Sequence, residues 1–279
     1  MKIALGTVQF GTDYGAFGTG TKVTIDQVAR ILDAARTAGI TVLDTARGYG
    51  TSEDVLGQMD TAAFKVVTKC PGIIHPDEIA PAFAASQGAL QRPVYGYLLH
   101  NAQDLLGDHR DAVWRALCQL RDGGQVTRIG ISAYSLAEVT AVLAHYPITL
   151  VQLPAHVLTP WYTDCQLPDT LEVHIRSAFL QGFLLSNPTA LPKRFAPWQS
   201  TLQTFCAQAK ASGLSQLQAA LAPLVRSDAI DCVVVGVDGF TQLQEILTAV
   251  ETIPDVIPQF GPFPDVTAAL TDPRTWNEA

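Results

Sequence analysis

The segment TVLDTARGYG, residues 41–50, decides how the rest of the chain is interpreted. It begins as a short apolar run of the kind that forms a buried strand, with Asp44 near its end, and it continues into a polar loop that carries Tyr49. A carboxylate at the end of a buried strand has to be paired or face a cavity, because an isolated charge in an apolar interior is costly. The segment therefore predicts a strand that delivers an acid and a phenol to a polar pocket.

Runs of this kind recur along the whole chain. We count eight of them: IALGT (3–7), TVLDTA (41–46), FKVVTK (64–69), VYGYLL (94–99), RIGIS (128–132), TLVQL (149–153), EVHIRS (172–177) and DCVVVGV (231–237). Most intervals show helical periodicity, as in residues 25–39 and 111–124. Strands that alternate with helices pair in parallel through right-handed crossovers. Eight such units predict an α/β fold of the (β/α)8 TIM barrel type, with its chemistry at the C-terminal ends of the strands.

One unit of the predicted barrel is irregular. Between the sixth and seventh runs, Pro154, Pro160 and Pro168 are spaced too closely for a long helix. We therefore expect a short or missing sixth helix. We expect a single barrel domain over residues 1–279, with the Pro-rich tail 253–279 packing near the barrel.

Four polar residues close successive predicted strands: Asp44, Tyr49, Lys69 and His100. A phenol has a pKa of about 10, and a nearby ammonium favours its phenolate form. Asp44 can hold Lys69, and an imidazole can donate a hydrogen bond to a substrate oxygen or relay a proton. Each residue alone also has a structural explanation as a cap, a packing group or a paired core residue. The four together indicate a proton-transfer site.

Seven segments of the chain resemble, in order, the signature blocks of the aldo-keto reductase superfamily. They are LGTVQFGTDYG (5–15), DTARGYGTSEDVLG (44–57), VVTK (66–69), YLLHN (97–101), RIGISAY (128–134), LVQLP (150–154) and HIRSAFLQGFLL (174–185). The last block resembles a bacterial branch with a VRSxFLQG-type sequence. The resemblance implies that Tyr49 is the general acid/base, that Lys69 and Asp44 tune it, and that His100 orients a carbonyl group.

The resemblance also implies a nicotinamide cofactor, since none of these side chains supplies electrons. Ser132 and Gln152 match residues that hydrogen-bond the carboxamide, and Arg176 stands where many relatives place an aromatic that stacks on the ring. Phosphates would lie against the backbone between Ser177 and Gly182, and against the start of the helix after Gly236. The residues implied for these phosphate contacts are Ser177, Gln181, Gly182, Gly236 and Val237.

The choice between the two nicotinamide cofactors stays open in the sequence. Family frequency favours NADP(H), which we rank first by a small margin over NAD(H). The segment GVDGFTQLQEI (236–246), however, places Asp238 and Gln242 where NADPH-specific relatives carry basic residues. An acid there repels a 2′-phosphate and accepts hydrogen bonds from a free ribose diol, so the local chemistry favours NAD(H).

We therefore expect a carbonyl reductase that transfers a hydride to an aldehyde or ketone while Tyr49 delivers the proton. Candidate substrate contacts are Phe10, Tyr14, His156 and Trp161. Two alternatives remain: a catalytically silent nucleotide-binding regulatory or scaffold subunit, and a lyase or aldolase that uses Lys69 as a Schiff base.

Composition and net charge also limit the classes of partner that the protein can bind. The formal net charge of −8 argues against nucleic acid and anionic membranes, which require a basic face. Five scattered cysteines without metal-ligand spacing favour reduced thiols and no metal site. No signal peptide or membrane-spanning run is recognisable, so we expect a cytoplasmic protein that acts on a small carbonyl compound. The sequence indicates no oligomeric state.

Overall fold

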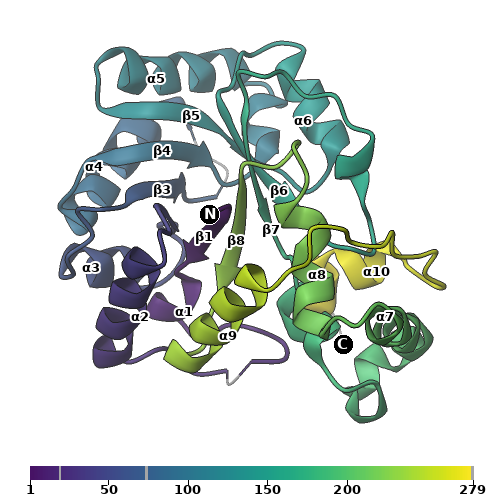
Figure 1. Ribbon diagram of the computed structural model, residues 1–279. Coiled ribbons are helices and arrows are strands. Elements are labelled where there is room, and N and C mark those ends of the chain that lie inside the picture. The colour runs from purple at the N-terminus through teal and green to yellow at the C-terminus, as the bar shows by residue number, and fades with distance from the viewer. Residues whose placement is uncertain (19, 73–74, 278–279) are drawn as a thin grey trace.

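The eight predicted strands form a closed parallel barrel (Figure 1). The computed structural model describes residues 1–18, 20–72 and 75–277. The strands are β1 (Ile3–Gly6), β2 (Val42–Asp44), β3 (Lys65–Cys70), β4 (Val94–Leu99), β5 (Val126–Ser132), β6 (Leu150–Pro154), β7 (Glu172–Arg176) and β8 (Cys232–Gly236). They pair in chain order, and β8 closes on β1 with Ile3 opposite Val233. The prediction of a (β/α)8 TIM barrel is confirmed.

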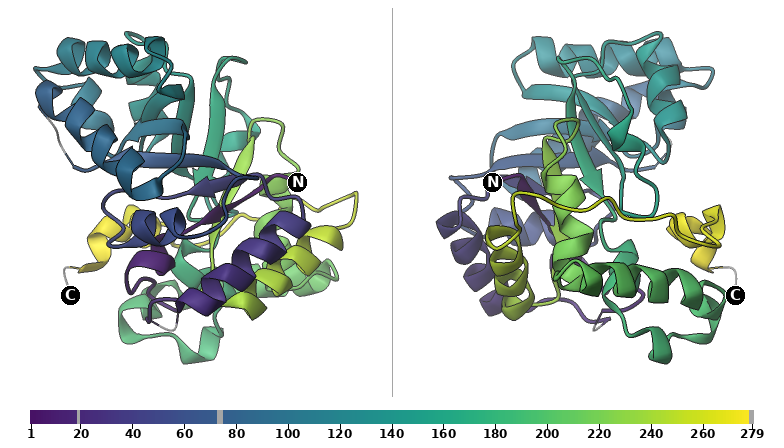
Figure 2. Two further views of the ribbon diagram at one scale, coloured as in Figure 1. Left: turned by 90° about the vertical axis from the view of Figure 1, so that its left-hand side faces the viewer. Right: turned by 45° about the vertical axis from the view of Figure 1, so that its right-hand side comes forward.

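Helices surround the barrel and connect its strands, as the two views of Figure 2 show. They are α1 (Val8–Gly11), α2 (Ile25–Thr37), α3 (Ser52–Gly57), α4 (Ile79–Leu90), α5 (Arg110–Asp122), α6 (Leu136–Leu143), α7 (Gln199–Ala211), α8 (Gln216–Val225), α9 (Phe240–Glu251) and α10 (Ala268–Thr271). Most of the long helices bury one face, whereas α8 has no exposed residue. Helix α2, for example, buries Val28, Ile31, Leu32 and Ala35, the apolar positions of its 3.6-residue period.

The connection between β6 and β7 contains no α-helix. Its one helical element is a single 3₁₀ turn, Trp161–Thr163, which begins directly after Pro160. The indole nitrogen of Trp161 donates a hydrogen bond to the carbonyl oxygen of Pro154 (2.8 Å), which folds the segment back on the end of β6. The predicted loss of the sixth helix is confirmed, and the proline spacing is its physical reason.

The barrel interior contains a layer of small and medium apolar side chains, which we call the apolar layer. Its members are Ala4, Val42, Val67, Leu98, Leu150 and Val234. Strand side chains alternate between two faces, so the residue two positions later points the same way. Those later positions are Gly6, Asp44, Lys69, His100, Gln152 and Gly236. Strand periodicity thus directs an acid, an amine, an imidazole and an amide to the C-terminal mouth of the barrel.

A second polar group lies inside the barrel on β7. His174 is fully buried, and its Nε2 lies 2.8 Å from Oε1 of Glu172. Oε2 of Glu172 accepts a hydrogen bond from the hydroxyl of Tyr95 (2.5 Å). Burial lowers the pKa of His174, but the neighbouring Cys232 thiol and the Glu172 carboxylate outweigh it and raise that pKa to about 9. His174 is therefore a buried imidazolium at neutral pH.

This buried imidazolium makes stability depend on pH. The pKa of His174 in the folded protein, about 9, exceeds the value of about 6.5 expected for an unfolded chain. Its contribution is therefore fully present below pH ~6.5 and is lost as the pH rises through about 9. We expect the difference in unfolding free energy between the wild type and His174→Gln to shrink by on the order of 3 kcal/mol across that window. Urea titrations at each pH measure it, and a pH-independent difference contradicts the assignment.

The end of the chain packs beside the barrel in a second apolar cluster. Leu270 of α10 and Trp276 are buried there, and the Trp276 ring meets the ring of Phe195 edge-on with centroids 5.0 Å apart. Figure 1 shows α10 next to α7, on one side of the barrel. Within the described residues, no helix combines the length and apolarity needed to cross a membrane.

Candidate active site

The centre of the site is a buried ion pair between strands β2 and β3. Nζ of Lys69 lies 2.8 Å from both carboxylate oxygens of Asp44 and 2.9 Å from the carbonyl oxygen of Thr45. The Lys69 side chain has no exposed surface. The hydroxyl oxygen of Tyr49 lies 3.5 Å from the same Nζ. The structure therefore brings three of the four predicted proton-transfer residues into direct contact.

The charge on Lys69 is maintained by its partners. Burial alone lowers the pKa of an ammonium group, but the Asp44 carboxylate and the Tyr49 phenol raise the pKa of Lys69 above its ordinary value. Lys69 is thus a permanent cation beside the phenol. A fully buried and paired ammonium does not present a free amine, which argues against the Schiff-base alternative.

His100 lies beside Tyr49. The two ring centroids are 6.0 Å apart and the rings meet edge to face. Burial, together with the positive charge of Lys69, lowers the pKa of His100 to about 4. The imidazole is therefore neutral at physiological pH, and it has one N–H to donate to an oxygen placed between it and Tyr49.

Two glycines fix the loop that carries Tyr49. A side chain at Gly11 would place its Cβ 1.7 Å from the carbonyl oxygen of Tyr49, and Gly50 has a φ of +57°. The amide of Thr51 donates to the carbonyl oxygen of Gly11 (3.3 Å). Only glycine permits this close approach and this backbone conformation without strain. Helix α1 and the Tyr49 loop are thus locked together, which sets the position of the phenol.

Two buried residues that follow Tyr49, Ser52 and Glu53, anchor the same loop to neighbouring strands. Oγ of Ser52 lies 2.8 Å from Oγ1 of Thr7, and the Glu53 carboxylate accepts a hydrogen bond from Oγ1 of Thr68 (2.6 Å). Arg47 also donates to Glu53 (3.2 Å). The start of α3 is therefore tied to β1 and β3, and this explains why a serine and a glutamate are buried at the start of this short helix.

Gln152 links the ion pair to the cavity. Its Nε2 donates to Oδ1 of Asp44 (2.6 Å) across the barrel, from β6 to β2. Its Oε1 is buried and has no hydrogen-bond partner in the described part of the protein. A buried acceptor without a partner is costly, so a ligand donor at this point stabilises the site. Ser132, the other predicted carboxamide contact, lies opposite Gln152 in the β5–β6 register and is also buried.

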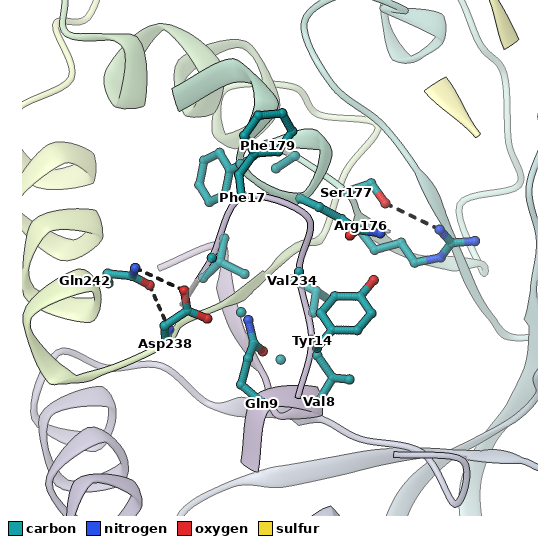
Figure 3. Close-up of a pocket in the computed structure, with 18 of the residues that line it drawn as sticks. Val8, Gln9, Tyr14, Phe17, Arg176, Ser177, Phe179, Val234, Asp238 and Gln242 are labelled. Atoms are coloured by element: carbon teal, nitrogen blue, oxygen red, sulfur yellow. Dashed lines mark hydrogen bonds between the residues drawn. The ribbon is translucent and has the colours of Figure 1, made fainter. Parts of the chain in front are cut away.

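A cavity of about 490 Å³ opens from these residues across the C-terminal mouth of the barrel. This size is typical of small-molecule and cofactor sites. At one end it is lined by Asp44, Tyr49 and Gln152, and at the other by Asp238, Gln242, Glu245 and Ile246, which we call the α9 end. Figure 3 shows side chains from the first, seventh and eighth strand loops converging on it. The cavity is elongated and joins the proton-transfer residues to the start of α9.

The loop after β7 forms one wall of this cavity in an unusual backbone conformation. Ser177, Leu180 and Gln181 have positive φ angles of 64°, 49° and 51°, and Gly182 has 100°. Non-glycine residues seldom adopt this region, and such conformations concentrate at ligand sites. Ser177, Gln181 and Gly182 all line the cavity, and all three are predicted phosphate contacts.

The loop between α1 and α2 also lines the cavity with Gly15, Phe17 and Gly18, whereas the sequence predicts only Tyr14 of this loop as a site residue. The amide of Ala16 donates to Oε1 of Gln181 (3.0 Å), and the Phe17 ring packs against Phe195 with centroids 4.7 Å apart. A Cβ at Gly182 would lie 2.8 Å from Cβ of Phe17. The signal in the sequence is the glycine-rich stretch GTDYGAFGTG (11–20), which holds two aromatic residues.

Arg176 is held at the edge of the cavity by the segment that follows β5. Its guanidinium stacks over the Tyr134 ring at 4.4 Å and donates to the carbonyl oxygen of Ala133 (3.0 Å). Arg274 stacks over the same ring at 3.6 Å, and its neighbour Pro273 lines the cavity. Arg176 therefore has a fixed position and a planar face beside the ligand space.

The predicted substrate contacts are not all at the cavity. Tyr14 lines it, but Phe10, His156 and Trp161 do not. Phe10 is fully buried in the core, and His156 is buried in the loop after β6, where burial lowers its pKa to about 3. Val237 is also buried and lies outside the lining residues, whereas Gly236 and Gln242 are part of them.

Comparison with known proteins places this site in a family context. The family model described as "Aldo/keto reductase family" matches residues 2–257. The oxidoreductase sirO of Leptosphaeria maculans is 32% identical over 146 residues, which are 49% of this chain and 44% of that protein. An uncharacterised oxidoreductase of Mycobacterium tuberculosis is 32% identical over 143 residues, 49% of this chain and 43% of that protein. The chain thus spans less than half the length of the curated relatives it matches.

Solved structures share the fold at low sequence identity. The holo form of aldo-keto reductase AKR11C1 from Bacillus halodurans superposes with a TM-score of 0.73 at 20% identity, covering 91% of this chain and 88% of that one. A second structure, from Pseudomonas aeruginosa, has a TM-score of 0.65 at 17% identity, covering 89% and 88% of the two chains.

Proposed function

Because the chain belongs to the aldo/keto reductase family, we propose that it is a nicotinamide-dependent oxidoreductase that reduces an aldehyde or ketone to an alcohol. Tyr49 acts as the general acid in this proposal. The observation that carries it is the contact of the Tyr49 hydroxyl with a buried, charged Lys69 at the end of an elongated cavity. A phenol beside a cation exchanges protons more readily than an isolated phenol.

The cavity fits a nicotinamide dinucleotide, held as NADP(H) or NAD(H). The unpartnered Oε1 of Gln152 is an acceptor for a carboxamide N–H, and the backbone from Ser177 to Gly182 borders the space where a pyrophosphate would lie. Arg176 contributes a positive charge and a planar face on the same side. When bound, the dihydronicotinamide supplies the hydride that no side chain can provide.

The chain's own residues handle the proton and the orientation of the substrate. His100, neutral because of its lowered pKa, donates a hydrogen bond to the carbonyl oxygen and polarises it. Tyr49 delivers its proton to the same oxygen as negative charge develops there. Lys69, which stays charged, stabilises the phenolate that remains, and Asp44 holds Lys69 at the required position.

An assay of carbonyl-dependent cofactor oxidation tests the proposal. The full chain is incubated with NADH or NADPH and a panel of small aldehydes, ketones and sugars, and the loss of dihydronicotinamide absorbance is followed. We expect consumption only when a carbonyl compound is present, with one alcohol formed for each cofactor oxidised.

The opposite outcome points to a different role. Tight binding of a nucleotide, with no turnover of any carbonyl compound in either direction, contradicts the reductase proposal. That result favours the silent nucleotide-binding subunit, because the same cavity then serves a regulatory or scaffold function.

A further inference from the structure

The charge around the cavity is distributed unevenly. In the described part of the chain, Arg176 is the one cationic side chain among the lining residues, and it lies on the β7 side. The α9 end contains two acids, Asp238 and Glu245. Figure 3 shows Asp238 and Gln242 on one side of the cavity and Arg176 on the other. A ligand that reaches from Tyr49 to α9 therefore meets negative charge at its far end.

The carboxylate of Asp238 is held in place by its neighbours. Nε2 of Gln242 donates to Oδ2 of Asp238 (3.4 Å), and the backbone amide of Asp238 donates to Oε1 of Gln242 (2.7 Å). On the other side lies Gly18, where an added Cβ would be 2.5 Å from Oδ2. Since Gly18 belongs to the loop that crosses the cavity, the carboxylate is enclosed between this loop and α9.

A nearby cation from another helix does not offset this charge. Arg30 of α2 reaches α9, but its guanidinium stacks over the Phe240 ring at 4.4 Å, and Arg30 does not line the cavity. The amide of Phe240, at the start of α9, already donates to Oε1 of Gln27 (3.3 Å). Among the described residues, this end of the cavity thus has acceptors in place and no cation that would receive a doubly charged phosphate.

We infer that Asp238 selects NAD(H) over NADP(H) by accepting hydrogen bonds from the 2′- and 3′-hydroxyls of the adenosine ribose. This inference rests on the proposed function. A dinucleotide bound with its nicotinamide beside Tyr49 and Gln152 would place its adenosine half at the α9 end of the cavity. Two vicinal hydroxyls match the two oxygens of a carboxylate. A 2′-phosphate at that point faces the like charge of Asp238, whose carboxylate accepts a hydrogen bond from Gln242 and lies against Gly18.

Binding of the two reduced cofactors to the full chain tests this inference. NADH and NADPH are titrated separately and followed by quenching of protein fluorescence. We expect the wild type to bind NADH at least about tenfold more tightly than NADPH. In Asp238→Asn, which keeps the size of the side chain and removes its charge, the preference should fall to about threefold or less. Most of that change should come from tighter binding of NADPH.

A matched control removes the same charge from the other end of the helix. Glu251→Gln changes an exposed residue at the end of α9, so the preference for NADH should stay as in the wild type. Raising the ionic strength should narrow the wild-type preference, because salt screens the repulsion between Asp238 and a 2′-phosphate.

The outcomes separate this inference from the proposed function. Equal or tighter binding of NADPH by the wild type, or an unchanged preference in Asp238→Asn, overturns the role of Asp238 and leaves the reductase proposal intact. Binding of neither nucleotide overturns both, because the cavity is then no dinucleotide site.

Discussion

Replacing Tyr49 with phenylalanine should lower the rate of carbonyl reduction by roughly 10² to 10⁴-fold. The substitution removes the hydroxyl that lies 3.5 Å from Nζ of Lys69 and leaves the ring in place. Cofactor affinity should change little, since the proposed cofactor contacts come from Gln152 and from the loops after β7 and β8. Steady-state turnover of the best carbonyl compound, together with cofactor titration, measures both quantities.

The control for this prediction is a phenol outside the cavity. The hydroxyl of Tyr146 donates to Asp111 on the outer side of the barrel, so Tyr146→Phe removes the same group without touching the site. It should retain wild-type turnover. If Tyr49→Phe also retains it, Tyr49 is not the general acid, and the proton reaches the carbonyl oxygen from another group.

Replacing Lys69 with methionine should destabilise the fold by about 3–5 kcal/mol. Methionine approximates the length of the lysine side chain but removes the ammonium. The Asp44 carboxylate then stays buried and, among the described residues, keeps only the amide of Gln152 as a side-chain donor. The free energy of unfolding from urea titration measures this loss. Lys210→Met, an exposed substitution on α7, should change it by less than about 0.5 kcal/mol.

A double variant distinguishes the effect of losing the Asp44–Lys69 ion pair from the effect of losing the packing of the Lys69 side chain. In the double variant Lys69→Met/Asp44→Asn, the uncompensated charge is gone, and most of the lost stability should return. Carbonyl reduction should stay impaired, because the cation beside Tyr49 is still missing. A double variant that is no more stable than Lys69→Met alone shows that packing around Lys69, and not its charge, holds this part of the barrel together.

Much of the fold could be predicted from local patterns. The run at residues 94–99 coincides with β4, and the prolines at 154, 160 and 168 foretell the missing helix between β6 and β7. Both signals are local, because strand burial and proline geometry depend on neighbours in the chain. The meeting of Asp44 with Lys69 follows from a similar rule, since parallel strands bring their C-terminal ends to one mouth.

The remaining parts of the site depend on contacts between distant segments. Phe17 is positioned by its contact with Phe195, and Asp238 is enclosed by Gly18. In both pairs the two residues are far apart in the chain. The hydrophobic periodicity of a sequence gives no information about such contacts between distant segments. The same limit explains the wrong placement of His156, which is predicted from the sequence as a candidate substrate contact. Its position just after β6 gives no indication that the loop folds inward and buries the imidazole.

The apolar layer has a consequence for how protons return to the site. Each reduction in the proposed reaction uses up one proton from Tyr49. Across the described residues, no side-chain hydrogen bond connects the Glu172–His174 pair with the Asp44–Lys69 pair, and Val67, Leu98 and other layer members fill the axis of the barrel. Apolar side chains do not relay protons, so Tyr49 is reprotonated by solvent that enters through the C-terminal mouth of the barrel. Ligand exchange and reprotonation therefore use one common entrance.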